Sequence, residues 1–377
     1  METIFDKAFD QIVTYKEDKL AGNINSIPVP FPRLSKHFPG WERGRYTIIT
    51  ANSGVGKTKI AKFMLVTSIM KFAEDNPKMD IHIRWYALEE GELDFAHSFI
   101  ATILAVKFGI KMSSVKLKSL GEYTLTDDIQ KAVDDARHIL NKFMKNVTVI
   151  DFILNPYGIW KDVRDFAASR GEFYHEGRDA VTGVAFKNKM EVGKGFNKYY
   201  PNNPKEFVFI CTDHISLLHR EKNHKSDHEA IGKFSTDYCL GNMVKKLNYA
   251  VCNIQQQVSD KEKMQYTFKG SAVEAKVEPS LDGLGENKTT QRDADLVLGV
   301  FAPTRYGIDV YEGYKIAPAD GGFGDQFRSI KFLKDRHYGL ANSKINLFFN
   351  GAINFFVELP KAEDIAPQDY LNFKNKY

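Results

Sequence analysis

Cysteine, uninterrupted apolar runs and a large net charge are all scarce in this sequence of 377 residues. Its three cysteines, Cys211, Cys239 and Cys252, show no CxxC spacing, which argues against a disulfide framework and fits a reducing cytoplasm. No apolar stretch approaches the ~20 residues of a membrane span, so no membrane partner is expected. The formal net charge of +4, from 52 basic and 48 acidic residues, neither requires nor excludes a nucleic-acid partner.

What the sequence does contain is the composition of a globular protein, with 43% hydrophobic and 27% charged residues. Short apolar segments alternate with segments whose apolar residues recur at helical spacing. This alternation predicts an α/β fold with a doubly wound, mostly parallel sheet and helices on both faces. The strands are expected at 46–50, 80–88, 147–150, 207–212, 249–254 and 294–301, and the helices at 59–72, 92–108, 125–144, 159–168 and 227–247.

The stretch at 46–72 predicts a phosphate-binding site. A β-branched apolar run leads into the loop ANSGVGKT and then into a helical pattern, the context that a phosphate-binding loop requires. Glycines let the backbone approach a ligand, and the backbone N–H groups of the loop and helix start attract phosphate oxygens. Lys57 would reach the β- and γ-phosphates of a bound nucleotide, and the Thr58 hydroxyl would ligate Mg²⁺. The predicted nucleotide-binding residues are Ala51, Asn52, Ser53, Gly54, Val55, Gly56, Lys57 and Thr58.

The apolar strand at 207–212 ends at Asp213. An acidic residue at the C-terminal end of a central strand beside a phosphate loop usually holds Mg²⁺ through water, so Thr58 and Asp213 are the predicted metal residues. Four histidines follow, at 214, 219, 224 and 228. Their spacing does not match a zinc site, and a polar surface loop is expected there.

Two stretches interrupt the alternation. Residues 171–205 are rich in glycine, lysine, asparagine and aromatic residues; they form either a solvated surface excursion or a basic, aromatic arm that contacts a nucleic-acid strand. Residues 258–292 contain few large apolar residues, which is typical of a mobile loop. The lysines Lys261, Lys263 and Lys269 in this loop either contact the phosphates of a nucleic-acid strand or serve only solubility.

The two ends of the chain carry weaker patterns. Residues 3–19 have a single apolar stripe, which predicts a helix that packs either on its own core or on a neighbouring subunit. The tail after Pro360 is polar and is expected to be loosely held. Two antiparallel hairpins are expected before it, one joining 310–316 to 328–333 and a closing one joining 345–349 to 353–359 around Asn350-Gly351.

Six motifs, in this order, resemble those of the RecA-like ATPase domain of DnaB-type replicative helicases. They are SIPVPFPRLSKHFPGWERGRYTIITANSGVGKT, YALEE, FICTDHISLL, VCNIQQQ, TTQRDADLVLGVF and IKFLKDRHYGLANSKINLFFNGAINFF, and they span most of residues 26–359. Each motif alone is weak, whereas six in the right order are specific. The resemblance implies a RecA-like P-loop core with a C-terminal antiparallel hairpin, divided into a linker helix at 1–21, an ATPase domain at 22–360 with an insertion at 171–205, and a polar tail at 361–377.

The resemblance also implies catalytic roles at matching positions. Glu89 would polarise the attacking water, with Glu90 as the alternative, and Gln256 would sense the γ-phosphate, with Gln255 and Gln257 as alternatives. The catalytic residues implied in this way are Lys57, Glu89, Gln256, Lys334 and Arg336. The last two would be donated to the γ-phosphate of the neighbouring subunit.

The function implied by the resemblance is an ATP-dependent DNA helicase or translocase that needs ATP and Mg²⁺. It would act on single-stranded DNA as a hexameric ring in DNA replication, in the cytoplasm of a bacterial or phage-infected bacterial cell. A helicase loader or primase would be a further partner. The alternatives are a RecA-like recombination or repair ATPase that binds DNA without unwinding it, a packaging or regulatory ATPase, and a ring that binds nucleotide without turnover.

Overall fold

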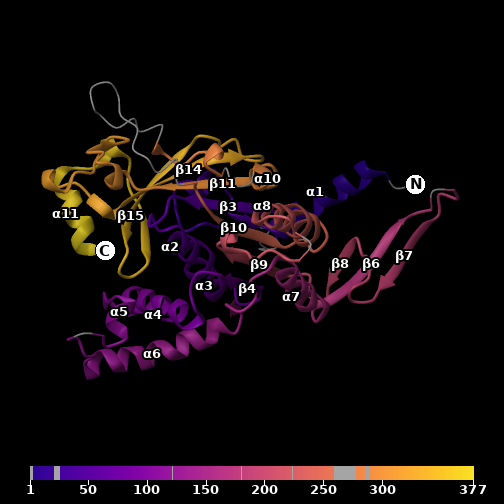
Figure 1. Cartoon of the computed structure of the whole chain (residues 1–377), viewed down its shortest axis with the longest axis horizontal. Coiled ribbons are helices and arrows are strands. Elements are labelled where there is room, and N and C mark those ends of the chain that lie inside the picture. Colours follow the sequence, from indigo (N-terminus) through magenta and orange to yellow (C-terminus); the bar gives the residue numbers. More distant parts are fainter. Residues whose placement is uncertain are drawn as a thin grey trace.

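A nine-stranded sheet with helices on both faces forms the body of the protein (Figure 1). The computed structural model describes residues 3–20, 26–120, 122–179, 181–222, 224–258, 277–284 and 288–377. Within these residues the strand order is β16-β15-β14-β11-β3-β10-β9-β4-β5. The strands from β11 to β5 run parallel to one another, and β14 to β16 are antiparallel. The predicted doubly wound α/β fold with a C-terminal antiparallel hairpin is therefore confirmed.

The parallel strands lie where the apolar runs predicted them. All six residues of β3 and all eight of β9 are buried, as expected for central strands covered on both faces. Because the strands are parallel, their carboxyl ends meet at one edge of the sheet, where the phosphate loop also lies. The parallel strands are β3 (Tyr46–Ala51), β4 (Asp80–Ala87), β5 (Val147–Ile150), β9 (Glu206–Asp213), β10 (Ala250–Gln256) and β11 (Leu296–Phe301).

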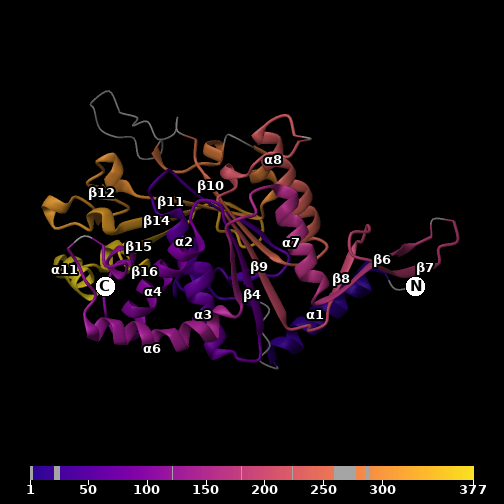
Figure 2. The same cartoon turned by 60° about the horizontal axis from the view of Figure 1, so that its bottom comes forward.

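Helices cover the two faces of the sheet as separate groups (Figure 2). One face packs against α2 (Lys57–Lys62), α3 (Ser68–Asp75), α4 (Glu92–Phe108) and α6 (Asp127–Met144), with the short α5 (Ser114–Leu117) beside them. The other face packs against α7 (Pro156–Ala168), α8 (Asp227–Lys233) and the helical segment Phe234–Val244. The short α10 (Lys288–Asp293) contacts this second group and leads into β11.

The C-terminal part adds strands β14 (Phe327–Asp335), β15 (Lys344–Asn350) and β16 (Phe355–Glu358). The closing hairpin is confirmed, although Asn350 pairs with Phe355, so that four residues rather than two make the turn. The predicted hairpin between 310–316 and 328–333 is wrong. β12 (Val310–Tyr311) pairs with β13 (Tyr314–Lys315), and β14 instead lies between β11 and β15, because its buried apolar residues suit the middle of a sheet.

The tail differs from the expectation of a loosely held segment. It forms helix α11 (Pro367–Lys376), and its Tyr370 ring lies 4.5 Å from the ring of Phe323, centroid to centroid. Tyr370 is buried in a third apolar cluster together with Phe327 and Phe348. The ring contacts, which the polar sequence of the tail conceals, hold this helix in place.

Residues 171–205 contain an antiparallel arm of three strands that projects from the body (Figures 1 and 2). Its strands are β6 (Gly171–Arg178), β7 (Ala185–Met190) and β8 (Lys198–Pro201). Phe173 and Phe196 stack at its base, 4.4 Å between ring centroids. Farther out, Lys187 lies 3.9 Å from the Tyr200 ring centroid and 3.2 Å from a Glu176 carboxylate oxygen. The excursion therefore contains a three-stranded β arm with packed side chains. Its contact with nucleic acid stays a prediction.

Helix α1 (Ile4–Leu20) has the predicted apolar stripe, and that stripe is exposed. Phe5 is 70% exposed and Ile12 is 63% exposed. Two short strands, β1 (Ser26–Ile27) and β2 (Trp41–Glu42), pair before β3. Within the described residues, then, α1 leaves its apolar face uncovered by its own chain. Among all the residues that the structure describes, no helix is both long enough and apolar enough to cross a membrane.

Candidate active site

The phosphate loop turns between β3 and α2 as its glycines predict. Gly54 and Gly56 have φ angles of 69° and 102°, a region that favours glycine. Gly56 immediately precedes α2, which continues through Phe63–Thr67 into α3 as one long helical segment. The loop therefore presents the backbone N–H groups at the start of a helix to the carboxyl edge of the sheet. This arrangement suits the binding of phosphate.

Three residues that the sequence did not single out form hydrogen bonds with the phosphate loop. The Arg328 guanidinium on β14 donates a 2.7 Å hydrogen bond to the Val55 carbonyl, and Arg305 donates one to the Ser53 carbonyl. The Asn52 side chain donates a hydrogen bond to the Tyr306 hydroxyl. These partners lie more than 250 residues along the chain from the loop. No motif marks them, so only the fold brings them to the loop.

Thr58 and Asp213 meet as predicted. The Thr58 hydroxyl lies 3.2 Å from Asp213 Oδ1, while Asp213 Oδ2 is buried and has no hydrogen-bond partner among the described residues. Burial raises the pKa of Asp213 to about 7, and the nearby carboxylates of Glu89 and Glu90 add to the rise. A buried carboxylate with an unpartnered oxygen beside a hydroxyl is a donor set that fits Mg²⁺.

The structure separates the two glutamates that follow β4. Glu90 accepts a 2.7 Å hydrogen bond from the ammonium of Lys62, which is 3% exposed. Glu89 is about half exposed, and its carboxylate lies 3.7 Å from His214 Nε2. Both glutamates line a cavity of about 460 Å³ together with Thr58 and Asp213. Glu89 is therefore the carboxylate left available to a water in this cavity, whereas Glu90 is engaged by Lys62.

His214 was expected in a polar surface loop, but it is 6% exposed and lies beside Glu89. Burial and the nearby charge of Lys57 lower its pKa, while Glu89 acts in the opposite direction. The only available sequence signal was its position directly after Asp213. It places an imidazole beside Glu89, whose carboxylate lines the cavity.

The three glutamines at the end of β10 divide between the faces of the sheet. Gln255 accepts a 2.8 Å hydrogen bond from Thr290, and Gln257 donates one of 2.9 Å to Thr50. Gln256 pairs in register with Ala51 at the start of the phosphate loop. Alternation along the strand places it on the same face as Ile254, which belongs to the core under α2. Of the three, Gln256 is thus the one on the face of the phosphate loop.

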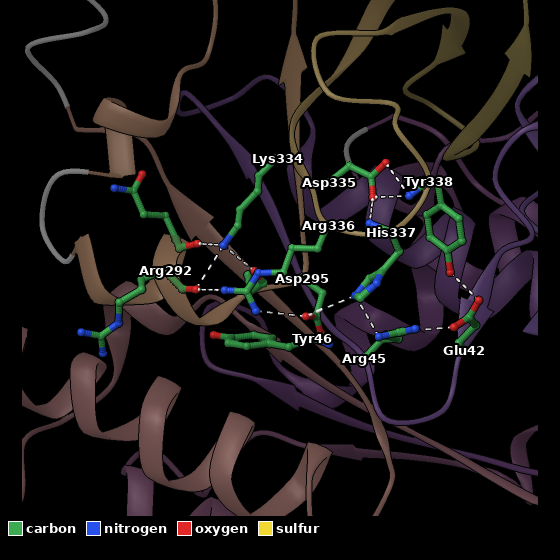
Figure 3. Close-up of polar contacts among 12 residues, drawn as sticks. Glu42, Arg45, Tyr46, Arg292, Asp295, Lys334, Asp335, Arg336, His337 and Tyr338 are labelled. Atoms are coloured by element: carbon green, nitrogen blue, oxygen red, sulfur yellow. Dashed lines mark hydrogen bonds and ion pairs between the residues drawn. The ribbon is translucent and has the colours of Figure 1, made fainter. Parts of the chain in front are cut away.

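Lys334 and Arg336 lie together near the end of β14 (Figure 3). The Lys334 ammonium donates to the carbonyls of Gln291, Arg292 and Ala294 at 2.5, 3.1 and 2.7 Å. Arg336 donates to the Arg292 carbonyl and to Asp295 Oδ1, the latter at 3.2 Å. Both side chains therefore face the C-terminal end of α10 and the residues that follow it.

Lys334 and Arg336 lie toward the amino ends of the parallel strands, whereas the phosphate loop of their own chain lies at the carboxyl ends. Lys334 pairs with Val297, which pairs with Ile48. Ile48 precedes Asn52 by four residues, or roughly 13 Å of strand. Arg336 lies beyond even Leu296 and Thr47 in this register. Neither residue reaches its own chain's phosphate loop in this structure.

The remaining predicted residues, Lys261, Lys263 and Lys269, lie outside the described residues. Lys57 is in place at the start of α2 and is 6% exposed. The structure thus brings together the phosphate loop, Asp213, Glu89 and Gln256 at the carboxyl edge of the sheet. It places Lys334 and Arg336 elsewhere.

Comparisons with known proteins identify the fold. The chain is similar to the ATPase domain of G40P, with 18% sequence identity and a TM-score of 0.67 over 96% of this chain and 100% of that chain. It is also similar to a DnaB-like replicative helicase, described with its interactions with primase, with 18% identity and a TM-score of 0.64 over 93% of this chain and 67% of that chain. No protein-family model matches, and no curated protein matches. The structural matches confirm the predicted RecA-like ATPase fold of DnaB-type proteins.

Proposed function

We propose that this chain is an ATP hydrolase that moves along single-stranded DNA as a ring-shaped helicase in DNA replication. One observation carries the proposal: within the described residues, Lys334 and Arg336 do not reach the phosphate loop of their own chain. The phosphate loop, Asp213 and Glu89 converge at the carboxyl edge of the sheet, while Arg336 lies toward the opposite edge. A neighbouring copy that presents its Arg336 to this site would complete it.

The residues of the chain then have distinct tasks. The loop N–H groups and Lys57 bind and orient the triphosphate, and Thr58 and Asp213 would hold Mg²⁺, which supplies charge neutralisation at the phosphates. Glu89 orients the attacking water, and its exposed carboxylate, which lines the same cavity as Asp213, suits this task. Gln256, next to Ala51, contacts the γ-phosphate. The incoming arginine stabilises the charge that develops in the transition state.

If each site is completed by the next copy, the copies are joined by head-to-tail contacts. Such contacts form a closed ring when the rotation between successive subunits closes on itself. Six copies are our expectation. The uncovered stripe of α1, with Phe5 and Ile12 exposed, is then the surface that docks on the neighbouring subunit. Residues 1–21 would form this linker helix, 22–360 the ATPase domain with its insertion at 171–205, and 361–377 the tail.

DNA is the proposed partner in the centre of the ring, with Lys261, Lys263 and Lys269 contacting its phosphates. The structural neighbours include a replicative helicase described with primase, so a primase or a helicase loader is the expected protein partner. The bacterial or phage-infected bacterial cytoplasm is the proposed location. This part of the proposal rests on the fold neighbours and on the motif order.

ATP hydrolysis, measured with and without a single-stranded oligonucleotide and alongside the particle mass, tests the proposal. We expect an oligomer whose turnover rises with DNA, and displacement of a strand from a forked duplex. Stimulated hydrolysis without strand displacement would favour a recombination or repair ATPase. Hydrolysis indifferent to DNA would favour a packaging or regulatory ATPase, and full turnover by a single copy would refute completion by a neighbour.

A further inference from the structure

Two basic residues, Lys334 and Arg336, are candidates for completing the neighbouring site, and they are bound very differently (Figure 3). An ammonium has three N–H donors and no more. Lys334 directs its ammonium at three carbonyls, those of Gln291, Arg292 and Ala294, at distances from 2.5 to 3.1 Å. These carbonyls belong to the end of α10 and its exit, where helical carbonyls lack intrahelical partners. Lys334 thus has no donor left for a phosphate while it holds this helix end.

Arg336 has donors to spare. A guanidinium carries five N–H groups in a planar fork, and two of them contact the Arg292 carbonyl and Asp295. The other three have no partner among the described residues. The Arg336 side chain is 41% exposed, whereas the Asp295 side chain behind it is 13% exposed. Arg336 can therefore be held on its inner edge and still present an outer edge to a phosphate.

The two side chains share one acceptor. The Arg292 carbonyl receives hydrogen bonds from both Lys334 and Arg336. Asp295 is fixed in turn, because its Oδ2 accepts a 3.0 Å bond from the Tyr46 backbone N–H at the start of β3. The Arg336 backbone N–H also bonds to the Asp295 carbonyl, at 3.1 Å. The position of the Arg336 fork therefore depends on where the end of α10 and Asp295 lie.

We propose that Lys334 is a positioning residue that secures the end of α10, so that the Arg292 carbonyl and Asp295 hold Arg336, which alone contacts the neighbour's phosphate. This inference rests on the proposed function, since it concerns how the neighbouring site is completed. The proposal makes Asp295 a second positioning residue, although its negative charge by itself would disfavour a phosphate nearby. An anion beside a phosphate-binding arginine weakens attraction to phosphate, so its benefit must come from orientation.

The test measures ATP turnover of Lys334→Met and Asp295→Ala in the full chain with DNA and Mg²⁺. Because misplacing a catalytic group by about 1 Å can cost up to about a hundredfold in rate, we expect both variants to lose at least about tenfold in kcat. KM for ATP should stay near the wild-type value, since each chain's own phosphate loop is unchanged. Lys334→Arg keeps donors for the carbonyls and should retain most of the rate, and Lys315→Met, at an exposed position on β13, should match the wild type.

Mixed assemblies distinguish positioning from misfolding. Lys57→Ala chains have an inactive site and an intact Arg336, so they should restore turnover to the sites of Lys334→Met and Asp295→Ala chains. A defect that persists in the mixture overturns the inference, because it then lies within the variant's own site or fold. Unchanged or faster turnover by Asp295→Ala, with slow turnover by Lys334→Met, also overturns it and makes Lys334 a direct phosphate ligand. If Arg336→Ala itself turns over at the wild-type rate, the proposed function fails instead.

Discussion

The Arg328 guanidinium donates a 2.7 Å hydrogen bond to the carbonyl of Val55, and so joins an antiparallel strand to the phosphate loop. Arg328 is 2% exposed, and its guanidinium carbon also lies 4.6 Å from the Phe349 ring centroid. Its two hydrogen bonds to the Asp325 and Phe327 carbonyls fix the guanidinium further. The loop is thus shaped from outside as well as by its own glycines.

Replacing Arg328 should therefore weaken nucleotide binding. Arg328→Met keeps much of the side-chain volume but leaves the Val55 carbonyl without this donor, a loss of about 1 to 3 kcal/mol for a buried acceptor. We expect a lower free energy of unfolding and weaker binding of a fluorescent ATP analogue, measured by urea titration and fluorescence. Arg137→Met is the control, because Arg137 is exposed and, among the described residues, pairs with Asp134 alone, one helical turn away on α6. Equal binding by both variants would show that the loop keeps its shape unaided.

Glu89 and Glu90 should separate by the kind of defect they cause. Glu89→Gln removes the carboxylate that orients water, so turnover should fall by about a hundredfold or more while ATP binding persists. Glu90→Gln instead leaves the buried Lys62 ammonium without a charged partner, which should lower the free energy of unfolding by about 3 kcal/mol. Single-turnover hydrolysis and urea unfolding measure the two effects. The reverse result, with lost turnover in Glu90→Gln and lost stability in Glu89→Gln, would show that Glu90 orients the water.

Completion of the site by a neighbour predicts rescue between two inactive chains. Lys57→Ala and Arg336→Ala should each lose turnover, by about a thousandfold for the arginine. Mixing the two should restore part of the activity, because some Arg336→Ala sites then receive an arginine from a Lys57→Ala neighbour. Steady-state phosphate release over a range of mixing ratios measures this rescue. The absence of rescue in assemblies of confirmed mixed composition would place the action of Arg336 within one chain.

Glu278 gives a prediction for pH. Burial alone would raise its pKa, but hydrogen bonds from Lys331, Lys344 and Tyr311 outweigh burial, and the pKa of Glu278 lies below its ordinary value. A lowered folded-state pKa stabilises the protein above the unfolded pKa of about 4.3, and this stabilisation is lost as the pH falls further.

Glu278→Gln should therefore lower the free energy of unfolding at pH 7 by about 3 kcal/mol. The difference from the wild type should shrink as the pH falls below about 4.3. Urea unfolding across this pH range is the measurement. Glu363→Gln, at a 73% exposed side chain paired with Lys361, is the control and should show little effect at any pH. A difference for Glu278→Gln that stays constant with pH would exclude a role for its charge.

Single-stranded DNA binding should weaken steeply as salt rises, because each phosphate contact releases counterions. Replacing Lys261, Lys263 and Lys269 together by alanine should reduce the slope of log affinity against log salt by about 2, at ~0.7 per contact. Fluorescence anisotropy with a labelled oligonucleotide measures the slope. Lys71, Lys131 and Lys142, which are exposed on α3 and α6, form the matched control triple. If the variant lacking Lys261, Lys263 and Lys269 shows the wild-type slope, these lysines do not contact the DNA.

The sequence by itself determined the elements whose signal is local. The loop from Ala51 to Thr58 lies between a strand and a helix, as its glycines and flanking apolar patterns predict, and Asp213 ends a central strand beside it. Strand and helix positions in the parallel part followed from periodicity within short windows. The order of the strands in the sheet is consistent with the predicted doubly wound arrangement.

Only the tertiary structure decided which of several neighbouring polar residues face the site. Glu89 and Glu90 are adjacent in the sequence, and it took the contact of Lys62 with Glu90 to separate them. The arginines behind the phosphate loop, the ring contacts of the tail at Tyr370, and the pairing of β14 with β11 all join residues far apart in the chain. A single sequence records the residue types of such contacts but not their partners, because partners are chosen by the packing of the whole fold.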